Sequence, residues 1–386
     1  FLMVLGAFGF MFGTGGSALI SKTMGEGDNE KAKHIFSLLI YVSIGCGVVI
    51  AVLGIIFIRP VAALLGAEGE MLDNCVLYGR IILAALPAFM LQYEFQSLFV
   101  TAEKPQLGLA VTVAAGVTNM VLDALLVAVF SLGLVGAAAA TALSQCVGGL
   151  VPLVYFGCKN SSALRLTRTE FDGKALLRTC TNGISELLSN ISMSVVGILF
   201  NMQLIKYSGE NGVAAYGVLM YVNFIFLAIF IGYSVGTAPL IGYNYGSGNH
   251  EELKNLLKRS LWIIGITSVA MVVGAKLLAR PLAAMYVGYD IELFELTLRG
   301  FTIYSLSFLF SGMAIFGSSF FTALNNGLIS ALISFLRTIV FEVSGVLLIP
   351  IILGIDGIWI SIVVANGLAA FVTVLFLLAK RKRYHY

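Results

Sequence analysis

The sequence predicts an all-α polytopic membrane protein made of two parallel six-helix repeats. First, 59% of the 386 residues are hydrophobic and 11% are charged, with a mean hydropathy of +0.97. A soluble domain carries about 25% charged residues, so this composition excludes a soluble globular protein. Second, apolar runs of about 20 residues, the length that a helix needs to cross a bilayer, recur along the chain. Third, the sequence resembles itself at an offset of 221 residues.

The internal repeat includes polar loops as well as apolar runs. The recurring pairs are Gly25/Gly246, Gly27/Gly248, Glu30/Glu251, Lys33/Lys254, Arg59/Arg280, Pro60/Pro281, Phe99/Phe320, Thr101/Thr322, Ala102/Ala323, Gly133/Gly354 and Gly136/Gly357. A fixed spacing over this length indicates duplication. Membrane proteins built in this way often expose a binding site alternately to each side, so the repeat indicates a transporter.

Eleven spans are expected, in chain order near residues 1–20, 35–58, 77–100, 106–130, 134–157, 181–205, 213–241, 256–279, 300–323, 327–353 and 357–379. The span near 181–205 has no counterpart in the first half, because its equivalent would lie before Phe1. We therefore expect a first helix upstream that is absent from this chain, which would complete two sets of six. Four prolines interrupt spans, where kinks can serve hinge bending: Pro87, Pro152, Pro239 and Pro350.

The expected organisation is an N-terminal lobe at 1–158 (helices 2–6 of twelve), a cytoplasmic linker at 159–180, a C-terminal lobe at 181–379 (helices 7–12) and a basic cytoplasmic tail at 380–386. The linker is polar and carries charges of both signs, as a solvated connection does. Sixteen cations fall on the side of the linker and tail, and six on the other. The positive-inside rule therefore puts the C-terminus in the cytoplasm.

Charged residues inside the spans are the first candidates for function, because an acid near the centre of a spanning helix costs about 3 kcal/mol on insertion. Asp123 is the strongest of them. Asn119 precedes it by four residues and so lies on the same helical face. Thr141 on the next helix lies at a similar depth. These three residues form the predicted coupling-ion site for H⁺ or Na⁺.

The repeat supports a functional role for this cluster. At the 221 offset, Asn119, Asp123 and Thr141 correspond to Val340, Ser344 and Ile362. The polar cluster thus exists only in the first half. A scaffold role common to both halves would not predict this asymmetry.

The remaining charged and amide residues of interest are candidates for a substrate path: Gln92, Gln96, Glu94, Glu186, Glu342 and Arg337. Each also has a structural explanation. Glu94 and Arg337 can neutralise each other, while Glu342 can pair with Arg337 or attract a cationic compound. Glu186 lies near a cytoplasmic helix end, where a carboxylate can reach the interface. Gln92 and Gln96 share a helix face, and amides also join membrane helices.

No cofactor is expected, and no metal ion other than Na⁺ at Asp123. The five cysteines show no Cys-x-x-Cys spacing, and the three histidines lie outside the spans, so neither a disulfide framework nor a zinc site is predicted. The basic tail is expected to bind lipid headgroups, and no nucleic-acid partner is expected.

Several motifs together resemble the multidrug and toxic compound extrusion (MATE) family, over essentially the whole chain. One is Asn119-x-x-x-Asp123 followed by the segment from Gly133 to Thr141, GLVGAAAAT. Two others are the paired loops GEGDNEKAK at 25–33 and GSGNHEELK at 246–254. The resemblance is to the prokaryotic branch, in which the fifth-helix Asn and Asp and the sixth-helix Thr take part in binding the coupling ion.

The resemblance implies a secondary antiporter in the cell (inner) membrane, and not an enzyme. Such a protein exports organic, often cationic, drugs or toxic compounds in exchange for H⁺ or Na⁺ by alternating access between two lobes. We expect it to be a monomer. The family's first-helix carboxylate falls in the helix that this chain lacks, and Glu186 is on the helix that carries a second-half carboxylate in some sodium-coupled members.

Two alternatives remain. A lipid-linked oligosaccharide flippase of the same superfamily shares the architecture, but binding phosphate would require more basic residues in the spans than Arg337. An intramembrane aspartyl protease would use a Gly-x-Gly-Asp motif, here ending at Asp28, and a Tyr-Asp, here ending at Asp290. Those two acids fall in loops on opposite sides and in reversed order, whereas the chemistry needs them to face each other in the membrane.

Overall fold

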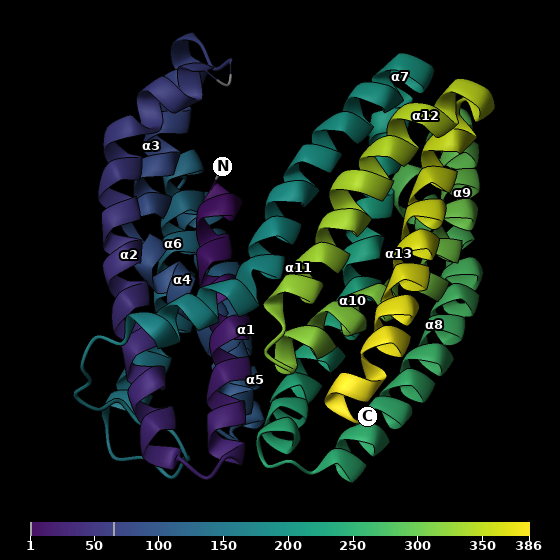
Figure 1. The fold of residues 1–386 in the computed structure, drawn as a ribbon. Coiled ribbons are helices and arrows are strands. Elements are labelled where there is room, and N and C mark those ends of the chain that lie inside the picture. The colour runs from purple at the N-terminus through teal and green to yellow at the C-terminus, as the bar shows by residue number, and fades with distance from the viewer. Residues whose placement is uncertain (1, 65) are drawn as a thin grey trace. The chain divides into compact units, whose positions relative to one another are not determined.

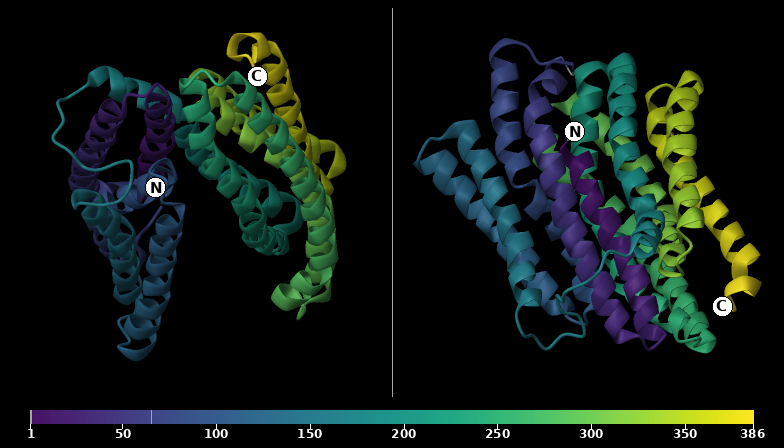
Figure 2. Two further views of the ribbon diagram at one scale, coloured as in Figure 1. Left: turned by 90° about the horizontal axis from the view of Figure 1, so that it is seen from below. Right: turned by 60° about the vertical axis from the view of Figure 1, so that its left-hand side comes forward.

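The computed structural model describes residues 2–64 and 66–386, and its regular structure in these ranges is entirely helical (Figure 1). The predicted all-α fold class is therefore confirmed. The chain divides into two compact units, unit 1 (Phe1–Leu187) and unit 2 (Leu188–Tyr386). Nine helices in the described ranges are long and apolar enough to cross a membrane. Within each unit the helices run side by side as a bundle (Figure 2).

Unit 1 contains α1 (Leu2–Gly25), α2 (Asn29–Leu64), α3 (Gly69–Ala84), α4 (Leu86–Thr101), α5 (Pro105–Asp123), the π-helical turn η1 (Ala124–Val129), α6 (Gly133–Gly157) and the start of α7 (Gly173–Gly246). Unit 2 contains the rest of α7, then α8 (His250–Val287), α9 (Ile291–Tyr304), the short 3₁₀ turn η2 (Ser305–Ser307), α10 (Phe308–Ala323), α11 (Gly327–Phe335), the π-helical turn η3 (Leu336–Glu342), α12 (Val343–Leu353) and α13 (Ile355–Tyr384).

The helix boundaries follow the sequence repeat. The starts of α2 to α6 recur as the starts of α8, α9, α10, α11 and α13, each within one residue of the 221 offset. The turns that begin these helices also match, since Gly27 and Gly248 both have positive φ, as do Gly133 and Gly354. Glycine adopts this conformation without steric penalty, which explains why these glycines recur in both halves.

The predicted span near 77–100 is two helices. The helix axis changes direction by 54° between α3 and α4. Pro87 lies in the first turn of α4. Proline has no backbone N–H, and N–H groups in the first turn have no partner within the helix, so a proline at this position is compatible with the start of a new helix. In unit 2 the corresponding α9 and α10 are joined through η2 and pass as one span. The bend therefore belongs to the first repeat.

α7 begins earlier than expected and covers two predicted spans. It starts at Gly173, so only residues 158–172 of the connecting region are non-helical, and the predicted linker at 159–180 is partly helix. Inside α7, Gly209 has φ of 62° and ψ of −148°. This non-helical residue separates the spans predicted at 181–205 and 213–241.

The first part of α7 packs tightly on α1 within unit 1. A Cβ atom at Gly183 would lie 1.9 Å from the Met11 carbonyl oxygen, and one at Gly15 would lie 2.1 Å from the Thr179 carbonyl oxygen. No larger side chain fits at either glycine. Small residues of this kind allow membrane helices to approach closely in the absence of a hydrophobic driving force between them.

The basic segment at the C-terminus is helical and packed. α13 continues through Lys380 to Arg383 and ends at Tyr384. The Tyr386 ring lies 5.2 Å from that of Phe320, and its hydroxyl donates to the Leu377 carbonyl oxygen at 3.0 Å. This aromatic contact fixes the end of the chain to unit 2.

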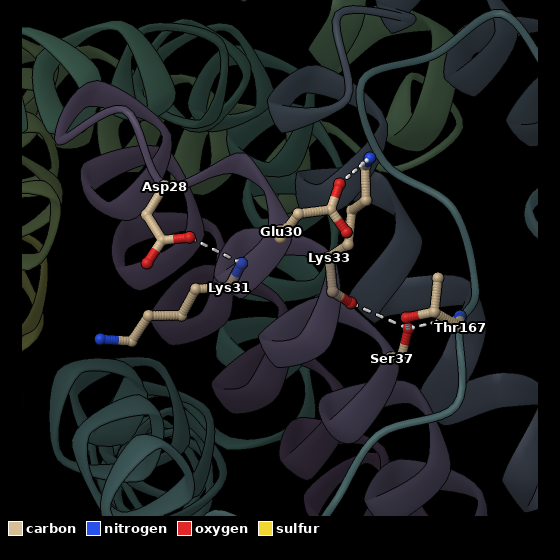
Figure 3. A network of polar contacts seen from close by, with 6 residues as sticks. All are labelled: Asp28, Glu30, Lys31, Lys33, Ser37 and Thr167. Atoms are coloured by element: carbon tan, nitrogen blue, oxygen red, sulfur yellow. Dashed lines mark hydrogen bonds and ion pairs between the residues drawn. The ribbon is translucent and has the colours of Figure 1, made fainter.

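The non-helical connection at 158–172 is anchored to α2 (Figure 3). The backbone N–H of Thr167 donates to the Ser37 hydroxyl oxygen at 2.9 Å, and that hydroxyl donates to the Lys33 carbonyl at 2.8 Å. Leu164 is fully buried among apolar side chains of unit 1. The Leu166 N–H bonds to the Phe156 carbonyl at 2.9 Å. The connection is thus an ordered strap on unit 1.

Replacing Ser37 by Ala should loosen this strap. The substitution leaves the Thr167 N–H without its acceptor, which costs about 1 kcal/mol. We expect faster cleavage by trypsin at Arg165 and Arg168 in the purified protein. Ser161→Ala, in an exposed part of the same segment, serves as the control. Equal cleavage of both variants would show that the Ser37 contact does not hold the strap.

Candidate functional site

The predicted coupling-ion residues lie where α5 ends and α6 packs beside it. Asp123 is the last residue of α5, and Asn119 lies one turn earlier. Both side chains are half-buried. Asp123 forms no hydrogen bond or ion pair with any residue that the structure describes. A half-buried carboxylate without a protein partner in an apolar span is available to a proton or a small cation.

Thr141 lies on α6, the neighbour of α5, and is also half-buried. Its hydroxyl donates to the Ala137 carbonyl at 3.0 Å, which leaves its oxygen lone pairs available as acceptors. The turn η1 (Ala124–Val129), which continues α5, approaches α6 closely just beyond this point, since a Cβ atom at Gly136 would lie 2.9 Å from the Leu126 carbonyl oxygen. The three predicted residues therefore belong to one packed helix pair.

A π-helical turn follows Asp123 directly. η1 covers Ala124–Val129, so the helix widens at the residue after the carboxylate. Single π turns are rare and occur frequently at functional sites. The change of helical pitch next to Asp123 is a feature that sequence periodicity does not predict.

A second polar site lies wholly inside unit 2. It is a cavity of about 190 Å³ between α7, α9, α10, η3 and α13. Arg337 and Glu342 both line it, with Thr338 between them on η3. The other polar lining residues are Tyr216, Asn223, Tyr304, Ser307, Ser311 and Asn366. Apolar side chains from the same helices complete the wall.

The π turn η3 brings Arg337 and Glu342 to the same cavity. In an α-helix with 3.6 residues per turn, residues five apart differ by about 140° around the axis. In a π-helix the hydrogen bonds join residues five apart, so these residues lie nearly above one another. The turn spans Leu336–Glu342 and therefore places both charges on one face.

Arg337 and Glu342 do not pair with each other. No ion pair joins them, and the Nε atom of Arg337 is buried with no acceptor in the described parts of the chain. A direct Glu342–Arg337 ion pair is therefore absent, although the two charges still interact through space. At the 221 offset the two residues correspond to Gly116 and Val121, so these charges exist only in the second repeat.

Tyr216 and Asn366, which line this cavity, were not predicted from the sequence. Tyr216 is almost fully buried, and its ring lies 5.3 Å from Phe200 and 6.5 Å from Trp359. Asn366 is also buried, and its side-chain amide donates to the Ile362 carbonyl at 2.9 Å. Amides and tyrosines inside predicted spans were the available signal, but their convergence depends on the tertiary packing of separate helices.

Gln92 and Gln96 line a separate, very small cavity in unit 1. Its volume is about 10 Å³, which is room for about one water molecule. Phe95, Phe99 and Gly148 form part of its wall. The two amides do share a face, as expected, but the space beside them is too small for an organic substrate.

Glu94 is fully buried on α4 in unit 1, and neither carboxylate oxygen has a hydrogen bond of normal geometry among the described residues, although the Ser43 hydroxyl lies close by. It lines none of the cavities described above. Arg337 belongs to unit 2, and each residue lacks an ion pair within its own unit. Mutual neutralisation of Glu94 and Arg337 thus stays a prediction. Glu186 lies half-buried on α7.

The long apolar helices and the few charges held inside them define a multi-pass helical membrane protein. The MatE family profile matches residues 1–125 and 187–348. The multidrug export protein MepA of Staphylococcus aureus (strain MRSA252) is 26% identical over 394 residues, which cover 98% of this chain and 84% of that protein. MepA of Staphylococcus saprophyticus subsp. saprophyticus is 28% identical over 393 residues, with 98% and 84% covered.

Solved structures share the fold. An outward-facing multidrug resistance MATE family transporter of the MOP superfamily aligns with a TM-score of 0.94 at 23% identity, over 100% of this chain and 86% of that one. A MOP superfamily transporter from Pyrococcus furiosus aligns with a TM-score of 0.93 at 23% identity, with the same coverage. The chain belongs to the MatE family, the MATE efflux transporters.

Replacing Glu94 by Met should stabilise the protein. Methionine fills a similar volume, and it removes two buried oxygens that lack a well-formed hydrogen bond, each an unfavourable group in an apolar core. We expect a higher thermal midpoint for the detergent-purified protein, equivalent to about 1 kcal/mol or more. Glu70→Met, at an exposed position, is the control and should change little. A marked loss of stability in Glu94→Met would instead mean that the carboxylate makes favourable interactions in the fold.

Proposed function

We propose that this protein is a secondary antiporter that exports organic, often cationic, compounds in exchange for H⁺ or Na⁺. The main support for this proposal is the half-buried carboxylate of Asp123, which has no hydrogen-bond or ion-pair partner in the described chain and lies beside the π turn η1. Support also comes from the relatives named multidrug export proteins. Asp123 binds the ion, while Asn119 and Thr141 supply neutral oxygen ligands from the same helix pair.

Coupling requires the ion to bind two conformations of the protein with different affinity. A ligand that binds both states equally shifts neither, however tightly it binds. Neutralising Asp123 with a proton or Na⁺ removes the cost of a charge in an apolar span. A conformation in which the carboxylate is more buried is therefore favoured only after loading, and this difference drives alternating access.

The proposed setting is the cell (inner) membrane with a cytoplasmic C-terminus, since the excess of cations falls on the side of the connecting segment and the tail. The proposed working form is a monomer, surrounded by lipid. The flippase alternative is disfavoured because Arg337 is the single basic residue well inside a predicted span, whereas holding a diphosphate-linked headgroup requires several.

The direct test is export of a fluorescent organic cation from proteoliposomes that contain the full-length protein. A proton gradient and a sodium gradient are imposed in separate experiments. Export driven by one of them, and abolished by the matching ionophore, supports antiport and identifies the ion. Absence of export under both gradients, with this cation and with organic probes of other charge, would contradict the proposal.

Asp123→Asn should fold and insert normally but lose gradient-driven export. The side chain has no described partner to lose, so the thermal midpoint should remain near that of the wild type. The amide cannot bind a proton or compensate Na⁺, so export should fall at least tenfold. Asp73→Asn is the matched control in the same unit, because Asp73 is exposed and its ion pair with Arg59 contributes about 1 kcal/mol at most. Wild-type export by Asp123→Asn would remove Asp123 from the mechanism.

A further inference from the structure

We propose that the unit 2 cavity binds an organic zwitterion, a compound that carries both a carboxylate and a protonated amine, between Arg337 and Glu342. The inference that such a compound is exported depends on the function proposed above. The inference that it binds in this cavity does not. The guanidinium of Arg337 holds the carboxylate of the ligand, and the carboxylate of Glu342 holds the amine. The cavity thereby discriminates against simple organic cations.

The first argument is that neither charged group forms a hydrogen bond or a direct ion pair with the described residues, although the two charges interact through space. Arg337 has a buried Nε with no acceptor, and Glu342 forms no hydrogen bond with the described residues. Charges inside a membrane protein normally pair with one another or mark a substrate path. Here η3 places both on the wall of one cavity without joining them. A ligand with the opposite charge at each end satisfies both.

The second argument is chemical selectivity. A simple cation gains from Glu342 but is repelled by Arg337, and at the low effective dielectric of the interior this repulsion is strong. A carboxylate reverses that balance, because a guanidinium can bind a carboxylate with two parallel hydrogen bonds. Arg337 therefore determines the class of ligand, and Glu342 adds the preference for an amine.

The third argument is the shape and lining of the cavity. Its volume of about 190 Å³ and its Tyr216, Phe200 and Phe224 rings suit a small compound with an apolar or aromatic body. Asn223 supplies further hydrogen-bonding capacity. The two charges are missing from the first repeat, so they do not serve a scaffold that both halves need.

The protein carries a local reporter of binding. It has two tryptophans. Trp359 is fully buried beside Tyr216, a lining residue, whereas Trp262 is exposed on α8. In a Trp262→Phe background, the fluorescence of Trp359 alone reports occupancy of the unit 2 cavity in the detergent-purified full-length protein.

The test compares three probes with one aromatic body: phenylalanine, phenylalanine methyl ester and N-acetylphenylalanine. They are a zwitterion, a cation and an anion. We expect phenylalanine to bind tightest, the N-acetyl derivative to bind more weakly, and the ester to bind at least tenfold more weakly than phenylalanine. An ester that binds as tightly as phenylalanine, or no response to any of the three probes, would overturn the proposal.

Variants identify the two charges. Arg337→Met should weaken the binding of phenylalanine about tenfold or more, so that phenylalanine no longer binds more tightly than the ester. Glu342→Gln should lower the affinity for phenylalanine to that for the N-acetyl derivative. Arg280→Met removes an exposed cation of the same unit outside the cavity and should change nothing. Arg337→Lys retains the positive charge and gives an intermediate affinity. Unchanged phenylalanine binding in folded Arg337→Met contradicts the assignment.

Failure of this inference is distinguishable from failure of the antiport proposal. The binding measurement is made at equilibrium without a gradient, so it does not depend on transport. Export of the fluorescent cation from proteoliposomes tests antiport without using the zwitterion. Selective phenylalanine binding without gradient-driven export of either the fluorescent cation or phenylalanine would reject the antiport mechanism alone. Export without selective phenylalanine binding would reject the zwitterion site alone.

Discussion

The cost of an uncompensated charge in the bilayer determines most of what this structure shows. Hydrocarbon offers no water to solvate backbone groups or side chains, so the chain is helical and its spans hold very few charged residues. Each charge that remains must be explained. Asp123 lies at the end of a helix, Glu94 is enclosed in the core of unit 1, and Arg337 and Glu342 share a cavity in unit 2.

Two π-helical turns connect these charges with the architecture. η1 begins directly after Asp123, and η3 contains both Arg337 and Glu342. η1 lies between α5 and α6, and η3 lies between the corresponding helices of the second repeat, α11 and α13. The two turns do not occupy equivalent residues. The two halves therefore present different side chains from the same helical arrangement. Duplication thus supplied a common helical frame, and local changes in helical pitch and side-chain charge made the halves chemically different.

The sequence predicted the helical class and the family, because hydropathy and a long repeat are strong signals. It indicated a kink at Pro87, but it did not predict the size of the bend between α3 and α4, which depends on packing as well as on the proline. It left open whether Glu342 pairs with Arg337, and it did not predict that both line one cavity, since the 3.6-residue period cannot reveal a π turn. It could not show that Gln92 and Gln96 border a space of only about 10 Å³, because cavity size depends on neighbouring helices distant in sequence.

The strap at 158–172 has a consequence for the order in which this protein is made. The strap and the first turns of α7 pack on α1 and α2, and all of these segments belong to unit 1. Every described residue that contacts the strap has therefore been synthesised once Leu187 has left the ribosome. Since domains generally fold as units from the N-terminal side during synthesis, the first half can bury its own polar connection while the second half is still being translated.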